Sequence, residues 1–173
     1  QHHGTHIQTL SGSSVWTFIS GGDGGDVAID DRSTAGESVR YGSSQNLGGF
    51  FRKTYNSANT LLSTVFPAHT VLGGGPAISV QFNTPVELNK VDPTRLIIGG
   101  GNAAYESLDR GDTVTALSPT SSVNGTFSGK PIAYGGWLAG VANTNILYYG
   151  SSTSVKIRVA AGDNGFGLPG VGN

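Results

Sequence analysis

The stretch N-I-L-Y-Y-G-S-S-T-S-V-K-I-R-V-A-A, from Asn145 to Ala161, decides the fold class. It begins with four strongly β-prone residues, Ile146 to Tyr149, and a polar turn follows them. From Ser154 to Val159 polar and apolar residues alternate, which predicts a strand with its apolar side chains on one face and Lys156 and Arg158 on the other. Two such runs around a short polar turn predict a β-hairpin with one buried face.

The rest of the chain repeats this pattern of short β-prone runs between turn signals. Further strands are predicted at Val15–Ile19, Val27–Ile29, Ser38–Tyr41, Phe50–Tyr55, Ala77–Phe82, Arg95–Ile98, Thr113–Leu117, Gly125–Phe127 and Ile132–Tyr134. The segment Ser57–Val65 fits either a strand or one short helix. Many short strands, with turn signals about every 8–12 residues, predict an all-β fold, either an antiparallel β-sandwich or a jelly roll.

Two of these predicted strands carry a more specific expectation. Val15–Ile19 is apolar on both faces, so we expect it to be covered on both, as a central or inserted strand would be. Ala77–Phe82 alternates, and we expect Ile78, Val80 and Phe82 to point inward.

The segment from Ile78 to Ile98, I-S-V-Q-F-N-T-P-V-E-L-N-K-V-D-P-T-R-L-I-I, resembles a strand-turn-strand unit of bacterial Ig-like domains. The resemblance is built from common turn chemistry and ends with this segment. For the whole chain we predict an extended polar arm over residues 1–14, a single sandwich domain over 15–161 and a Gly-rich tail over 162–173.

Composition excludes several classes of protein. The 173 residues suit one domain with a real core. Charged residues make up 12% of the chain, about half the usual share, and polarity comes instead from Ser, Thr, Asn and 28 Gly. With a net charge of −1 and no basic patch, a nucleic-acid partner is not expected. The chain has no Cys, and no apolar run reaches the ~18 residues of a membrane span.

The first residue suggests a cellular location. Gln1 is not a translation start, and the initiator Met is normally removed only before small residues, so we expect a cleaved signal peptide or propeptide upstream. An artificially trimmed chain is the alternative. The predicted location is therefore secreted or on the cell surface, with a virion as the alternative. In that setting Asn124, in the sequon Asn-Gly-Thr, is a possible N-glycosylation site.

An acidic Gly-rich loop is the candidate metal site. The run G-G-D-G-G-D, from Gly21 to Asp26, fits one copy of the calcium-binding β-roll repeat, but stacked copies are absent. Oxygen ligands on flexible backbone suit Ca²⁺. The candidate ligands are Asp23, Asp26, Asp30 and Asp31. A solvated acidic turn, with Arg32 as a partial counterion, is the competing interpretation, and no other cofactor is predicted.

Three further motifs favour ordinary structure over chemistry. Gly99, Gly101 and Ala104 satisfy the dinucleotide fingerprint, but the candidate helix from Asn102 to Leu108 is short and the expected acidic residue is missing. A Gly-rich connection is the better interpretation. Arg-Gly-Asp at 110–112 is interpreted as a turn. His2, His3 and His6 could chelate Cu²⁺, although a solvated arm is favoured.

No catalytic set stands out in the sequence. His69 is the one His outside the arm, and the chain has no nucleophile elbow. Glu106, Asp109 and Asp112 could supply the paired carboxylates of a glycosidase, but a solvated acidic edge is favoured. We therefore predict that the chain is not an enzyme.

Aromatic residues offer a candidate glycan site. Trp137 with Tyr134, and the pair Tyr148 and Tyr149, could form a platform on which sugars stack. Packing in the core is the favoured alternative for each of them.

These observations predict a structural subunit of an extracellular or surface assembly, with a pilus-like filament first and a virion capsid, decoration or tail protein next. The main partner would be the chain itself, in a polymer or shell. A strand that is apolar on both faces near a terminus suits donor-strand assembly. Its residues are Val15, Trp16, Thr17, Phe18 and Ile19. The rival is a monomeric carbohydrate-binding or adhesion module, whose partners would be surface glycans.

Overall fold

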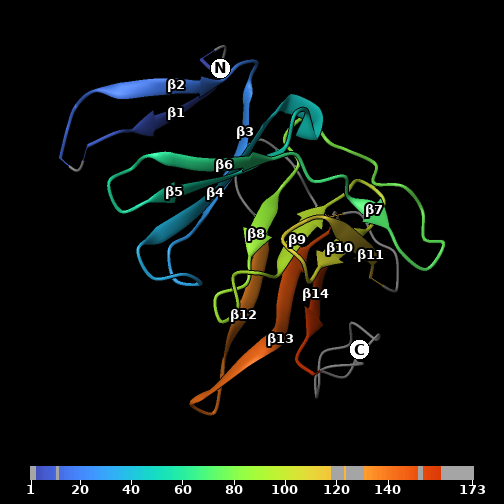
Figure 1. Ribbon diagram of the computed structural model, residues 1–173. Helices are drawn as coiled ribbons and strands as arrows, with labels where there is room; N and C mark the ends of the chain where they lie inside the picture. Colours follow the sequence, from blue (N-terminus) through green and yellow to red (C-terminus); the bar gives the residue numbers. More distant parts are fainter. Residues whose placement is uncertain (1–2, 11, 118–122, 124–130, 152–153, 161–173) are drawn as a thin grey trace.

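The computed structural model describes residues 3–10, 12–117, 123, 131–151 and 154–160, and its regular structure is nearly all β-strand (Figure 1). The all-β prediction is therefore confirmed. The predicted strand at Gly125–Phe127 and the tail at 162–173 lie outside the described residues. In chain order the elements are β1 (Thr5–Gln8), β2 (Trp16–Ser20), β3 (Gly24–Asp30), β4 (Glu37–Ser44), the 3-10 turn η1 (Gln45–Leu47), β5 (Phe51–Asn56), β6 (Leu61–Val65), β7 (Thr70–Val71), β8 (Val86–Leu88), β9 (Leu96–Gly99), β10 (Ala104–Ser107), β11 (Thr113–Ala116), β12 (Ile132–Leu138), β13 (Val141–Gly150) and β14 (Val155–Arg158).

The strands form three larger sheets and one separate hairpin. A four-stranded sheet has the order β3-β4-β5-β6, and a three-stranded sheet has the order β12-β13-β14; both are antiparallel. A five-stranded sheet has the order β7-β11-β10-β9-β8, in which only the pair β7 and β11 is parallel. The hairpin of β1 and β2 lies beside the four-stranded sheet (Figure 1).

The five-stranded sheet is the central layer, because both of its faces are buried. On β9, Leu96 and Ile98 pack with Val39 and Tyr41 of the four-stranded sheet. Ile97, which alternation places on the opposite face, packs instead with the three-stranded sheet. All three β9 side chains have no exposed surface. A continuous apolar run is what a strand covered on both faces requires, and the chain therefore folds as two sandwiches that share one sheet.

The stretch from 145 to 161 forms the predicted hairpin, but the buried face of its second strand is the opposite of the expected one. Arg158 is 8% exposed and Val155 is 62% exposed. The register pairs Arg158 with Leu147, which is fully buried, and paired residues share a face. The arginine is inside because the buried carboxylate of Glu106 lies opposite it.

The predicted strand at Ala77–Phe82 is not formed. Val80 and Phe82 are 45% and 44% exposed, and of the three apolar residues only Ile78 packs against the core. The backbone here bonds to loop partners instead of a ladder: Ser79 O accepts from Gly101 N, and Gln81 N donates to Thr84 Oγ1. Polar and apolar residues do alternate here, but the main-chain groups are bonded to loop partners, so no strand forms.

The N-terminal hairpin also differs from the expectation. β1 lies inside the segment predicted as an extended arm and pairs with β2. Within the predicted assembly strand, Trp16 and Phe18 are each 58% exposed, so in the described part of the chain this strand is not covered on both faces. The hairpin is held to the four-stranded sheet by Lys53 Nζ, which donates to Ile19 O at 3.3 Å, and by Asn59 Nδ2, which donates to Thr9 O at 2.7 Å.

Two ambiguous segments resolve as strands. Ser57–Val65, which fitted strand or helix, contains β6. The candidate helix after the Gly-rich fingerprint is instead β10, which forms a hairpin with β9. A dinucleotide site needs a helix N-terminus at this point, so the preference for a Gly-rich connection agrees with the structure.

Candidate functional site

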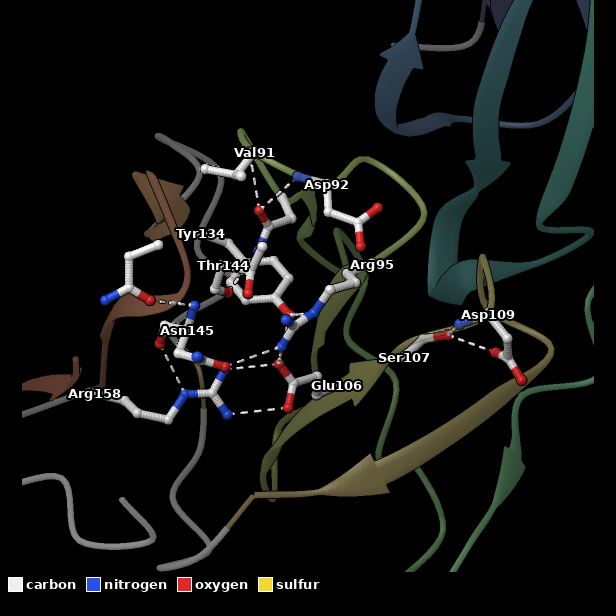
Figure 2. Close-up of polar contacts among 12 residues, drawn as sticks. Val91, Asp92, Arg95, Glu106, Ser107, Asp109, Tyr134, Thr144, Asn145 and Arg158 are labelled. Carbon is white, nitrogen blue, oxygen red and sulfur yellow. Dashed lines mark hydrogen bonds and ion pairs between the residues drawn. The ribbon is translucent and has the colours of Figure 1, made fainter. Parts of the chain in front are cut away.

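A buried polar network joins the central sheet to the three-stranded sheet (Figure 2). Its centre is Glu106 on β10. Arg158 of β14 donates to this carboxylate from Nη1 at 3.0 Å and from Nη2 at 2.6 Å, and Arg95, just before β9, donates from Nη2 at 3.0 Å. The hydroxyl of Tyr134 on β12 donates to the same carboxylate. We call Arg95, Glu106, Tyr134 and Arg158 the Glu106 network.

Neighbouring groups fix the geometry of the Glu106 network. Arg95 Nε donates to Tyr134 Oη at 2.9 Å, and Arg158 Nε donates to Asn145 O at 3.0 Å. Beside it, the buried Asn89 donates from Nδ2 to Thr144 O at 2.7 Å and so ties the chain before β9 to β13. Because several donors of both guanidinium groups have defined acceptors, the cations are held in place.

The electrostatics of the Glu106 network oppose proton transfer. Burial acts to raise the pKa of Glu106, but the hydrogen bonds from Arg158 and Tyr134 and the charge of Arg158 outweigh it and lower the pKa to about 2. Burial and the charge of Glu106 raise the pKa of Tyr134. A carboxylate that stays ionised and a phenol that stays protonated suit a structural role, since a general acid or base needs a pKa near the working pH.

The other two carboxylates of the hypothetical glycosidase set have separate partners. Asp109 accepts from Ser107 Oγ at 2.8 Å and from the backbone N–H of Thr113 at 2.9 Å. Asp112 pairs with Arg52 at 3.2 Å. Each of the three carboxylates is therefore bound by different protein donors.

The Arg-Gly-Asp tripeptide is a turn whose charged groups are used inside the molecule. Arg110 lies 3.5 Å from the buried Asp30, and Asp112 pairs with Arg52. Gly111 has a φ of 94° and donates its N–H to Ser107 Oγ at 2.8 Å. The glycine supplies the left-handed conformation that this turn requires.

The four candidate calcium ligands make separate contacts. Asp26 accepts from the backbone N–H groups of Val27 and Val86, both at 2.9 Å, and Asp30 accepts from Arg32 N at 3.1 Å. Asp31 lies 4.0 Å from Arg32, and the backbone N–H of Asp23 donates to Gln45. Among the described residues no group of three or more His, Cys, Asp or Glu side chains could hold a metal ion.

The histidines are also dispersed. The ring of His6 stacks edge-on against Phe18, with the ring centroids 5.6 Å apart, and His2 lies outside the described residues. His69 is packed against Phe50 and bonds through Nδ1 to Gly111 O at 2.8 Å; burial lowers its pKa. These positions give His69 a packing role.

The proposed glycan platform is not formed. Tyr134 has no exposed surface, so its ring cannot stack on a sugar. Trp137, by contrast, is 61% exposed on β12, although core packing was favoured for it, and Tyr148 is 41% exposed while Tyr149 is buried. The bulge between Tyr134 and Gly136 separates the buried and exposed parts of β12. Asn124 lies outside the described residues.

The predicted assembly strand borders an apolar groove. A cavity of about 500 Å³ lies between the N-terminal hairpin and the outer face of the four-stranded sheet. We call this cavity the apolar groove. Its lining includes six large apolar side chains, those of Ile7, Trp16, Ile19, Val27, Ile29 and Phe51. Ile29 is 62% exposed, so the groove opens to solvent.

The last strand of the four-stranded sheet presents an open edge. In the described part of the chain β6 pairs only with β5, and all five of its residues, Leu61 to Val65, are exposed. Phe66, which follows, is 67% exposed. We call Leu61–Phe66 the β6 edge. It carries no charge, whereas monomeric proteins usually protect such edges with charged residues, Pro or bulges. The register shift opposite Thr54 and Tyr55 gives this edge partial protection.

Sequence reasoning missed the Glu106 network and the β6 edge. Arg95 and Arg158 carried no signal, because nothing in the chain places either one near Glu106 before the sheets are packed. The β6 edge had a partial signal in the uncharged run L-L-S-T-V-F, but the position of a strand within its sheet depends on long-range pairing.

Comparison with protein-family models, curated proteins and solved structures finds no match to this chain. In the described residues no helix has the length and apolar character to cross a membrane.

Proposed function

We propose that this chain is a structural subunit of an extracellular or surface assembly, which associates with copies of itself into a pilus-like filament. The observation that carries the proposal is the β6 edge. Its five strand residues are all exposed and uncharged, and its outer main-chain groups have no strand partner among the described residues. A second strand that pairs there satisfies these groups and covers Leu61 and Leu62.

Composition and the N-terminal hairpin support the same proposal. With 12% charged residues and a net charge of −1, copies of the chain repel one another little. Trp16 and Phe18 of the N-terminal hairpin are exposed, so a neighbouring copy that covers them would stabilise the hairpin. The segment Val15–Ile19 remains the candidate donated strand, although donation requires it to separate from β1.

Negative-stain electron microscopy of the purified chain over a range of concentrations tests this function. Filaments are expected. Closed shells would favour the virion alternative, which uses the same kinds of edge and face contacts. Discrete monomers that bind glycans would contradict self-assembly and favour a carbohydrate-binding module.

Deletion of residues 1–20 tests donor-strand exchange separately. If Val15–Ile19 is donated, the truncated chain forms no filaments while circular dichroism still shows folded β-structure. Filaments of the truncated chain would exclude donor-strand exchange and every other contact that needs the N-terminal hairpin, and would leave self-assembly through the β6 edge intact.

A further inference from the structure

The hairpin of β12 and β13 ends in an uncovered apolar tip. Trp137 is 61% exposed, Leu138 is 55% exposed and Val141 is 69% exposed. We call these three residues the β12–β13 tip. Figure 1 shows this hairpin projecting away from the layered body. A Cβ atom added to Gly140, at the turn, would meet nothing within 4 Å, so the turn itself is open.

The β12–β13 tip is an ordered projection. The ladder continues to the turn, with Trp137 opposite Ala142 and Leu138 opposite Val141. Ala139 and Gly140 both have positive φ, 51° and 80°, as the tight two-residue turn of a hairpin requires. The twenty residues from Pro131 to Gly150 include no charged side chain. No charged side chain of this hairpin therefore has to lose its hydration when the tip enters an apolar site.

The apolar groove has matching chemistry. The β1–β2 hairpin, which forms one of its walls, lies at the opposite end of the molecule from the β12–β13 tip (Figure 1). Its volume of about 500 Å³ falls within the range that accommodates a bulky apolar group. The charged side chains at its border, Asp31 and Arg40, have opposite signs and balance one another. Because the tip and the groove lie at opposite ends, the tip cannot reach the groove of its own chain.

We propose that the β12–β13 tip of one copy inserts into the apolar groove of the next. This inference deepens the proposed self-assembly and rests on it. Because the groove needs β2 paired with β1, tip insertion is an alternative to donor-strand exchange of Val15–Ile19. A projecting patch and a complementary site elsewhere on the same chain make a head-to-tail contact, and copies joined in this way continue into an open filament unless the rotation closes a ring. The tip supplies Trp137 as the anchor, and the groove supplies Trp16, Ile29 and Phe51 as walls.

The surface area that the β12–β13 tip can bury limits the affinity between two copies. One buried Trp contributes roughly 150–250 Å², and a stable interface needs about 800 Å² from each partner. The tip alone is therefore a weak contact. The filament is expected to form only at high concentration, or where the β6 edge adds a second contact.

Engineered disulfides test the inference directly, because the chain has no Cys of its own. Chains with Leu138→Cys and chains with Ile29→Cys are mixed at equal concentration under mild oxidation. The expected product is a disulfide between the two different chains, in excess over both homodimers. The matched control pairs Leu138→Cys with Ser57→Cys, an exposed turn residue outside the groove, and is expected to cross-link at least ten-fold less.

A second variant separates insertion from chance encounter. Trp137→Asp, added to the Leu138→Cys chain, is expected to lower the yield of the mixed disulfide at least ten-fold without changing the melting temperature, since Trp137 is exposed. An unchanged yield, or Leu138→Cys homodimers as the main product, would overturn the insertion. Filaments of the unmodified chain without the mixed disulfide would overturn this inference alone, whereas an unmodified chain that stays monomeric would overturn the proposed function as well.

Discussion

Arg158 on β14 donates two hydrogen bonds to Glu106 on β10, one to each carboxylate oxygen, at 2.6 and 3.0 Å. The two side chains are 10% and 13% exposed, so the pair is shielded from solvent. Arg95 donates to the same carboxylate from the other side. One carboxylate thus links the central sheet to the three-stranded sheet, from which the β12–β13 tip projects.

Replacing Glu106 by Gln should destabilise the fold by about 3 kcal/mol or more, because two buried guanidinium groups lose their counterion while the side-chain shape is kept. Urea unfolding followed by circular dichroism measures this loss. Asp31→Asn is the matched control: its ion pair with Arg32 is exposed and 4.0 Å long, and its removal should change stability by no more than about 0.5 kcal/mol. Equal effects of the two substitutions would contradict the role assigned to Glu106.

Glu106 should also make stability depend on acid pH. Its pKa is lowered in the folded state from 4.5 to about 2, so its stabilising contribution is complete above the unfolded pKa and is lost as the pH falls from about 4.5 to about 2. This lowering of the pKa of Glu106 corresponds to about 3 kcal/mol of folding stability if solvent does not screen the buried carboxylate. Melting temperatures of the unmodified chain should fall over this window, and those of Glu106→Gln should fall less.

Some acid sensitivity should remain in that variant. The pKa of Asp30 is also lowered, because hydrogen bonds from Ser33 and Arg32 and the charge of Arg110 outweigh the effect of burial. Identical pH profiles for the variant and the unmodified chain would show that Glu106 is not the group responsible.

A charge on the β6 edge should block association. Ser63→Lys places a cation in the middle of the exposed strand, where a second strand would have to bury it. Light scattering after size exclusion should show a lower mean mass than for the unmodified chain at the same concentration. Ser57→Lys, the same change in the preceding turn, should leave the mass unaltered. If both variants associate like the unmodified chain, the β6 edge is not a contact.

Replacing Ala139 by Asn should stabilise the chain by up to about 1 kcal/mol. Ala139 has a φ of 51°, which costs a residue with a Cβ atom about 1–2 kcal/mol, and Asn before Gly is the preferred pair for this turn. Thermal unfolding should show a higher melting temperature, while the mixed disulfide of the tip and the groove should still form. A lower melting temperature would mean that the turn is held by other contacts.

The sequence predicted strand positions well because alternation and turn residues are local signals. It predicted the hairpin around Gly150 and the strand at Arg95–Ile98 for this reason. It could not predict which face of β14 is buried, because Arg158 is drawn inward by Glu106, 52 residues earlier in the chain. For the same reason the sequence did not predict that a third sheet, β12-β13-β14, packs on the central sheet. Local patterns show neither the number of sheets nor how they stack.

Less of the candidate site than of the fold could be predicted from the sequence. Trp137 was singled out, yet core packing was favoured for it, because composition alone does not show that a hairpin projects beyond the body. Tyr134, three residues earlier, has the buried position instead. The two differ because the bulge before Gly136 carries the strand away from the core.

Sedimentation velocity of the unmodified chain over a hundred-fold range of concentration tests the central claim of self-association most directly. The proposed function predicts a weight-average sedimentation coefficient that rises with concentration, and a smaller rise for Ser63→Lys. A single monomeric species at every concentration would contradict it.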